Sequence, residues 1–130
     1  MFSFKTQQAL AQPFPASAIK HRTQRWKDKK TGQWHTIQFD YVETATVIDR
    51  LNTLFGFEWT FTVQEHLRVE HEILVLGVMT VCGVTKTAFG GAVIGTGEEA
   101  VVNAYKAAVG DAIKLCAKQF GVGLHLWMTD

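Results

Sequence analysis

Three lysines recur on one four-residue period near the end of the chain, Lys106, Lys114 and Lys118, and Gly110 holds the remaining place in the series. Residues four apart lie on the same face of an α-helix. The spacing therefore predicts a cationic strip with a gap at the glycine, where a phosphate backbone can come close. Lysines that neutralise phosphates release counterions, so such binding weakens as salt rises. Asp111 lies beside the strip and is placed to hold a lysine; an ordinary solvated helix face is the alternative explanation.

A second basic group lies between residues 20 and 30, although the formal net charge of the whole chain is only +1. Its members are Lys20, Arg22, Arg25, Lys27, Lys29 and Lys30, against the single acid Asp28. A segregated basic segment produces a local positive field even in a near-neutral chain. Trp26, Trp34 and Tyr41 lie in or beside it, so bases could stack where phosphates are neutralised. A solvated hairpin tip and packing of the tryptophans in a core are the alternatives.

Patterns for nucleotide chemistry are weak. The glycine-rich segment from Gly90 to Gly97 precedes a predicted helix and is interpreted as a loop, but it contains neither GxGxxG nor GxxxxGK[ST]. The helix that follows begins with Glu98 and Glu99, whose carboxylates would repel a phosphate from the helix N-terminus. We therefore do not expect a nucleotide-binding loop.

Metal and nucleophile patterns are also weak. His66 and His71, with glutamates at 65, 70 and 72, fit no HExxH or zinc spacing, and we assign this segment to a polar surface turn between strands. Cys82 and Cys116 lie in apolar surroundings without a CxxC pair, which favours buried free thiols. We predict no catalytic residues, no metal and no other cofactor, and hence a protein that is not an enzyme.

Periodicity predicts the elements that position these residues. Apolar residues from Thr44 to Phe55 follow a helical stripe, with Thr44 as N-cap and Gly56 at the C-terminal end. The other expected elements are a short helix and extended arm in 1–19, a β-hairpin of 21–27 and 33–41, strands at 57–64, 72–82 and 84–89, and a long helix at 98–120. The result is an α+β fold: a hairpin and a three-stranded antiparallel meander with two main helices on one side.

The composition suits one globular domain, since 130 residues that are 47% hydrophobic can form a real core. We expect residues 1–20 to form an N-terminal helix and arm, and residues 21–130 a single domain. No apolar run reaches the length of a membrane span, and the N-terminus lacks a secretory signal. A cytoplasmic protein without membrane contact is expected.

Several segments resemble the Rad52 family of single-strand annealing proteins. Residues 111–121, DAIKLCAKQFG, are similar to the family's DGLKRALRxFG helix, and NAYKAAV at 103–109 to the stretch before it. Residues 41–57 resemble YIEGHRVINLANEMFGY, and VLGV at 75–78 and the turn at 88–90 fall in matching order. The early QPFPA at 12–16 is similar to the bacterial DdrA branch of this superfamily, a group that protects DNA ends. The resemblance covers residues 36 to 124.

The resemblance implies a β-β-β-α core, subunits arranged in a ring, and single-stranded DNA in an outer groove. By position, Lys114, Lys118 and Lys106 match basic residues on the groove helix, and Tyr41 matches a tyrosine at the groove. Arg25 or Arg22 corresponds to an arginine on the first hairpin strand. Trp26, Trp34, Lys27 and Lys86 are further candidates for base stacking or phosphate contacts. Leu115 stands where the family has a second basic residue, so the groove carries less charge here.

The sequence thus predicts a protein that binds single-stranded DNA as a homo-oligomer and promotes annealing in recombination and double-strand break repair, without ATP or metal. A single-strand-binding protein or a recombinase is a further candidate partner, and a nucleoid-associated protein of bacterial, phage or organellar origin fits. Three alternatives stay open: protection of single-stranded ends without annealing, a small α+β enzyme with the 90–97 segment as a lid, and a purely structural oligomer.

Overall fold

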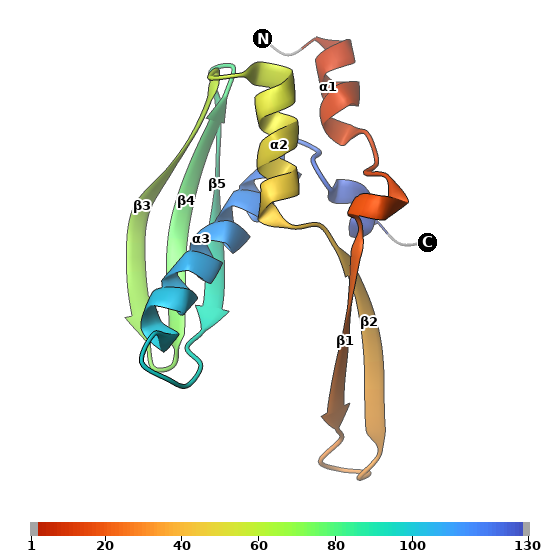
Figure 1. Cartoon of the computed structure of the whole chain (residues 1–130), viewed down its shortest axis with the longest axis vertical. Helices are drawn as coiled ribbons and strands as arrows, with labels where there is room; N and C mark the ends of the chain where they lie inside the picture. The colour runs from red at the N-terminus through yellow and green to blue at the C-terminus, as the bar shows by residue number, and fades with distance from the viewer. Residues whose placement is uncertain (1–2, 129–130) are drawn as a thin grey trace.

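The computed structural model describes residues 3–128 and confirms the α+β class. The elements in chain order are α1 (Phe4–Ala11), the 3-10 turn η1 (Ala16–Ala18), β1 (Lys20–Lys27), β2 (Trp34–Tyr41), α2 (Thr44–Phe55), β3 (Trp59–Val69), β4 (Glu72–Val81), β5 (Val84–Val93), α3 (Ala100–Lys118) and the 3-10 turn η2 (Leu124–Leu126). β1 and β2 form a two-stranded sheet, and β3, β4 and β5 form the predicted meander. In Figure 1 the β1–β2 hairpin projects as a separate arm from the body that the second sheet builds with the helices.

Helix α3 covers one face of the three-stranded sheet. Its side chains at Ala104, Ala108 and Ala112 repeat every four residues and pack against Ile73 and Val75 of β4, as the predicted apolar stripe requires. β4 alternates accordingly, since its odd-numbered residues from 73 to 81 are buried and the even-numbered ones are not. Small side chains on the helix allow its backbone to lie close to the sheet.

Helix α3 lies very close to the sheet at Gly90. A Cβ atom added there would lie 2.3 Å from the amide nitrogen of Ala112 and 2.4 Å from the carbonyl oxygen of Ala108. The strand β5 continues through Gly90 and Gly91 to Val93, so the predicted start of a loop at Gly90 is wrong. Glycine is present here because the helix backbone occupies the space that a side chain would need.

The N-terminal helix is fixed onto α2. Leu10 and Phe14 are buried in the same core cluster as Leu51 of α2. Arg50 donates from Nη1 to the carbonyl oxygens of Leu10 and Gln12, and its guanidinium lies 3.8 Å from the centroid of the Phe14 ring. Burial lowers the pKa of Arg50 from its usual value.

Two further predictions about the strands need correction. Glu65 and His66 belong to β3, opposite Leu76 and Val75, and not to a surface turn. A register shift after Val63 lets β3 continue to Val69, so the turn contains only Glu70 and His71. The sequence showed polar residues there, but a bulged edge strand tolerates them because its outer side is open to solvent.

Thr44 and Cys82 also differ from expectation. Glu43 occupies the N-cap of α2, and Thr44 is the first helical residue, whose hydroxyl donates to the carbonyl oxygen of Gly110 at 3.3 Å. Cys82 is exposed at the β4–β5 turn with a positive φ of 50°, because the strand ends at Val81 and the chain reverses there. Cys116 is buried as predicted. Within residues 3–128, no helix combines the length and apolar character needed to cross a membrane.

Candidate nucleic-acid interface

A groove of about 690 Å³ separates β2 from the C-terminal half of α3. Lys114, Leu115 and Lys118 line the helix side, and residues 37–42 line the hairpin side. The turn η2 and Trp127 line the groove as well. Residues from the hairpin, α3 and the segment after it, far apart in sequence, thus share one concave surface.

Each groove lysine lies close to an aromatic ring. Lys114 donates from Nζ to the carbonyl oxygen of Val42 at 3.4 Å, and the same nitrogen is 5.7 Å from the centroid of the Tyr41 ring. The Lys118 ammonium is 3.1 Å from the centroid of the Trp127 ring. Burial lowers the pKa of Lys118 to about 8; the positive charge of Lys114 adds to this effect and the carboxylate of Asp111 opposes it.

The other members of the predicted strip are arranged differently. Gly110 does not leave room for a phosphate, because a Cβ there would lie 3.0 Å from Oγ1 of Thr44 at the start of α2. Asp111 accepts a hydrogen bond from the backbone N–H of Gly91 at 3.0 Å and acts on Lys118 only through its charge. Lys106 is exposed on the N-terminal half of α3 and does not line the groove. The strip therefore contributes Lys114 and Lys118 to the groove, and the neighbouring carboxylate of Asp111 lines the groove as well.

The register of the hairpin assigns its candidate residues to two faces. Residues directly opposite each other in an antiparallel pair project from the same side, and successive residues alternate. The pairs Lys20–Tyr41, Arg22–Phe39 and Trp26–His35 therefore share one face, and Arg25–Thr36 and Lys27–Trp34 share the other. Tyr41 reaches Lys114, so its face is turned toward the groove.

This register distinguishes the two candidate arginines. Arg22 projects from the groove side with Trp26, whose ring stacks on His35 at a centroid distance of 5.3 Å. Arg25 projects from the far side, where its guanidinium lies 4.9 Å from the centroid of the Trp34 ring. The structure thus brings Arg22 and Trp26 to the face of Tyr41, and it separates Arg25, Lys27 and Trp34 from that face.

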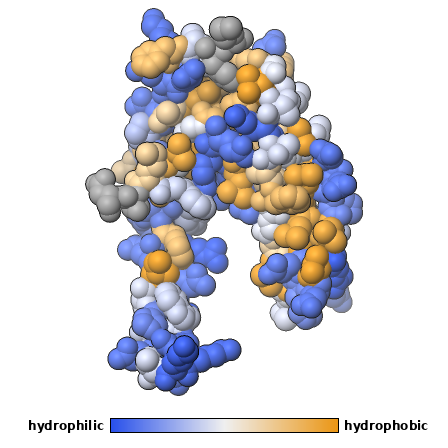
Figure 2. All heavy atoms as spheres, turned by 180° about the vertical axis from the view of Figure 1, so that it is seen from behind, coloured by the Kyte–Doolittle hydropathy of each residue, from blue (hydrophilic) through white to orange (hydrophobic). Residues whose placement is uncertain are grey.

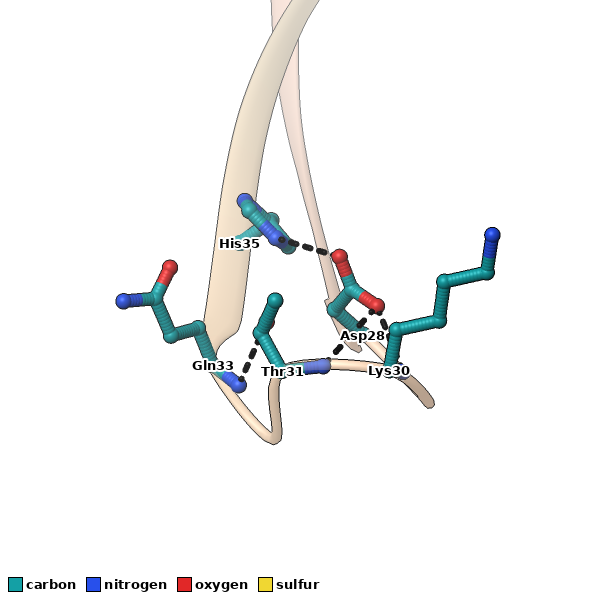
Figure 3. A network of polar contacts seen from close by, with 5 residues as sticks. All are labelled: Asp28, Lys30, Thr31, Gln33 and His35. Carbon is teal, nitrogen blue, oxygen red and sulfur yellow. Dashed lines mark hydrogen bonds and ion pairs between the residues drawn. The ribbon is translucent and has the colours of Figure 1, made fainter.

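The turn of the hairpin is shaped by the one acid of the basic segment. Asp28 accepts hydrogen bonds from the backbone N–H groups of Lys30 at 2.8 Å and Thr31 at 3.4 Å, and its second oxygen lies 3.6 Å from Nε2 of His35 (Figure 3). The N–H of Lys30 is the largest of the contributions that lower the pKa of Asp28. Gly32 completes the turn with a φ of +74°. The exposed lysines at 27, 29 and 30 surround this turn, in the hydrophilic tip of the arm in Figure 2.

Two parts of the groove were missed from the sequence, and Lys86 is a further candidate that lies outside it. Ile37 and Phe39 form an apolar wall on β2, and Trp127 lies over the end of α3. The alternation of apolar residues in 37–41 was a usable signal for the wall. Lys86 is partly buried on β5 opposite Met79, away from the groove lining. In the part of the chain described, 3–128, no group of three or more His, Cys, Asp or Glu is arranged to hold a metal ion.

A groove with lysines on one wall and exposed aromatic rings on the other is the arrangement that proteins use for single-stranded nucleic acids. The sequence model of the Rad52/22 family of double-strand break repair proteins matches residues 4–130. The chain belongs to this family, which confirms the resemblance of its motifs.

Curated relatives agree with this assignment. The chain is 33% identical over 121 residues to the single-stranded DNA-binding protein DdrA of Deinococcus radiodurans, covering 93% of this chain and 54% of that protein. It is 32% identical over 123 residues to the protein of the same name from Deinococcus deserti, covering 93% of this chain and 56% of that protein. The chain spans about half the length of these relatives.

Proposed function

We propose that this chain binds single-stranded DNA in the groove between β2 and α3 and promotes the pairing of complementary strands in recombination and double-strand break repair. The observation that carries the proposal is the pair of lysines, Lys114 and Lys118, facing one groove beside exposed aromatic rings. The two lysines are one helical turn apart, a rise of about 6 Å. They are therefore spaced to meet different phosphates of one strand.

The chemistry of annealing fits these residues. Neutralising phosphates reduces the repulsion between two incoming strands and releases counterions. No covalent bond forms or breaks, so neither ATP nor a metal is needed. The name of the Deinococcus relatives, single-stranded DNA-binding protein, supports the choice of ligand. Because those relatives are bacterial, we assign the protein to the nucleoid in the cytoplasm.

An oligomer is part of the proposal because the face of the three-stranded sheet away from α3 is apolar. Four of its side chains, Leu67, Val69, Phe89 and Val93, are 46–68% exposed. Figure 2, seen from behind, shows hydrophobic side chains gathered over this sheet. Contiguous exposed apolar surface of this kind marks interfaces. In a ring, neighbouring copies of the chain would cover this apolar face and align their grooves. The weak contacts of each copy would then add along one DNA strand.

The test is the rate at which two labelled complementary oligonucleotides pair, without ATP or magnesium. The wild type should accelerate pairing, and the Lys114→Ala/Lys118→Ala variant should not. The matched control is Lys5→Ala/Arg68→Ala, which removes the same charge outside the groove and should behave as the wild type. The slope of log affinity against log salt should fall by about 1.4 in the groove variant, since each lost phosphate contact contributes about 0.7. No binding by the wild type at low salt would refute the proposal, and a groove variant that anneals at the wild-type rate would place the site elsewhere.

The second candidate is protection of single-stranded ends without annealing. It is favoured by Leu115, a neutral residue lining the groove between the two lysines, which lowers the charge available to screen a second strand. Tight binding that slows digestion by an exonuclease but does not accelerate pairing would establish it. An enzyme with the 90–97 segment as a lid is disfavoured, because Gly90 to Val93 belong to β5.

A further inference from the structure

The segment after α3 reverses direction in a way that fixes its position. The N–H of Val122 donates to the carbonyl oxygen of Ala117 at 3.1 Å, and the N–H of Gly121 to that of Lys118 at 2.9 Å. These are the two hydrogen bonds of a Schellman motif, which needs a left-handed residue at Gly121, where φ is +102°. Val122 is buried in the core beneath the turn. The chain therefore leaves the helix along a defined path back over its last turn.

The backbone after this turn is also hydrogen-bonded. The N–H of Leu126 donates to the carbonyl oxygen of Gly123 at 3.1 Å, and the N–H of Trp127 to that of Leu124 at 3.0 Å. Leu126 packs against the core cluster, whereas Trp127 remains 67% exposed. These hydrogen bonds fix the main chain at Trp127, and its indole is not packed in the core.

One face of the indole is occupied by the Lys118 ammonium, 3.1 Å from the ring centroid. With one face occupied and most of the side chain exposed, the other face is open to solvent at the groove. A ring with a lysine on one face and an open second face can stack a base while the lysine remains beside the backbone. Tyr41 repeats the combination in part, since its partly exposed ring lies near Lys114.

We propose that Trp127 is a base-stacking residue and that Trp127 and Lys118 form one nucleotide subsite of the groove, in which the indole takes the base and the ammonium takes a neighbouring phosphate. The inference rests on the proposed binding of single-stranded DNA and adds a contact to the base itself. Because every base has a π-face, the subsite tolerates any sequence.

The experiment compares binding of two labelled strands of equal length, oligothymidine and an abasic deoxyribose-phosphate strand, by fluorescence anisotropy. The proteins are the wild type, Trp127→Ala, Trp127→Tyr and the control Phe57→Ala, which removes a fully exposed aromatic ring outside the groove. Measurements at pH 6.5 keep Lys118 charged in the wild type, since its pKa is about 8. Urea denaturation of each variant checks that it is folded.

On oligothymidine, Trp127→Ala should bind at least about fivefold more weakly, the loss expected for one stacked base. Trp127→Tyr should restore most of the affinity, and Phe57→Ala should match the wild type. On the abasic strand, the wild type and Trp127→Ala should bind equally, and the salt slope of Trp127→Ala should be unchanged.

Two results would overturn the inference alone: unchanged binding of oligothymidine by Trp127→Ala, or an equal loss on both strands, which would mean that the indole only shapes the turn. A wild type that binds neither strand at low salt would instead overturn the proposed function, and this inference with it.

Discussion

Replacement of Gly90 by alanine tests the tight contact between α3 and the sheet. The added Cβ would lie 2.3–2.4 Å from backbone atoms of Ala112 and Ala108. Carbon and its neighbours reach favourable contact near 3.5 Å, so α3 would have to withdraw by about 1 Å. Both contacting groups are backbone atoms in a helix, and neither can rotate away.

The energy follows from the size of this displacement. Overpacking a core costs about 1–3 kcal/mol, and the rigid contact at Gly90 places its alanine variant near the upper end, about 3 kcal/mol. With a urea dependence of about 2 kcal/mol per molar, the unfolding midpoint should fall by about 1.5 M. The withdrawal also loosens the packing of the alanines on α3 against β4, so the loss is spread over the helix that carries Lys114 and Lys118.

Urea denaturation followed by circular dichroism measures this change, at one protein concentration so that self-association cannot differ between variants through concentration. The matched control is Gly95→Ala, where an added Cβ meets nothing within 4 Å. It should stay within about 0.5 kcal/mol of the wild type. A Gly90→Ala variant as stable as the Gly95→Ala control would refute the reasoning, because it would show that α3 does not pack against β5 at this distance.

Three other predictions concern single side chains. Burial lowers the pKa of Lys118 to about 8, so its charge is present below pH 7 and lost as the pH rises through 8. Affinity for single-stranded DNA at constant ionic strength should therefore fall between pH 7 and 9. A Lys118→Ala variant whose affinity falls by the same amount would contradict this. Cys116 is buried, which raises the pKa of its thiol, whereas Cys82 is exposed. Iodoacetamide should therefore modify Cys82 in the native protein and Cys116 only after unfolding, as mass spectrometry can resolve. Equal rates of modification would contradict the burial of Cys116 in the core. Arg50→Ala should lower the free energy of unfolding by about 1–3 kcal/mol and speed amide hydrogen exchange in α1, because two carbonyl oxygens lose their donor and Phe14 loses its cation. Unchanged exchange would mean that α1 is held by apolar packing alone.

The elements were predictable where the apolar pattern is long and regular. The stripe of α2, the alanine face of α3 and the alternation in β4 all have the period of the element that they form. Gly90 was misassigned because glycine marks both loops and close backbone contacts, and only the position of α3 distinguishes the two. Glu65 and His66 were misassigned because a strand that continues through a bulge depends on its partner, here β4.

The site was predictable in part for related reasons. Helical spacing placed Lys114 and Lys118 on one face, but it could not reveal that Thr44 of α2 covers Gly110. The hairpin arginines depend on register, and a shift of one residue moves every side chain to the opposite face. Trp127 was missed because its place over Lys118 results from the hydrogen bonds of the turn after α3, which no periodic pattern describes.

The isolated position of the β1–β2 hairpin has a consequence for handling the protein. Within the described residues each of its strands pairs with only one neighbour, so both outer edges present unpaired backbone groups. Such edges promote aggregation, and charged side chains along them, lysines above all, are the usual protection. The basic residues from Lys20 to Lys27 therefore act as gatekeepers of β1 independently of any ligand. Variants that neutralise them should self-associate more readily, and light scattering separates that effect from a loss of DNA binding.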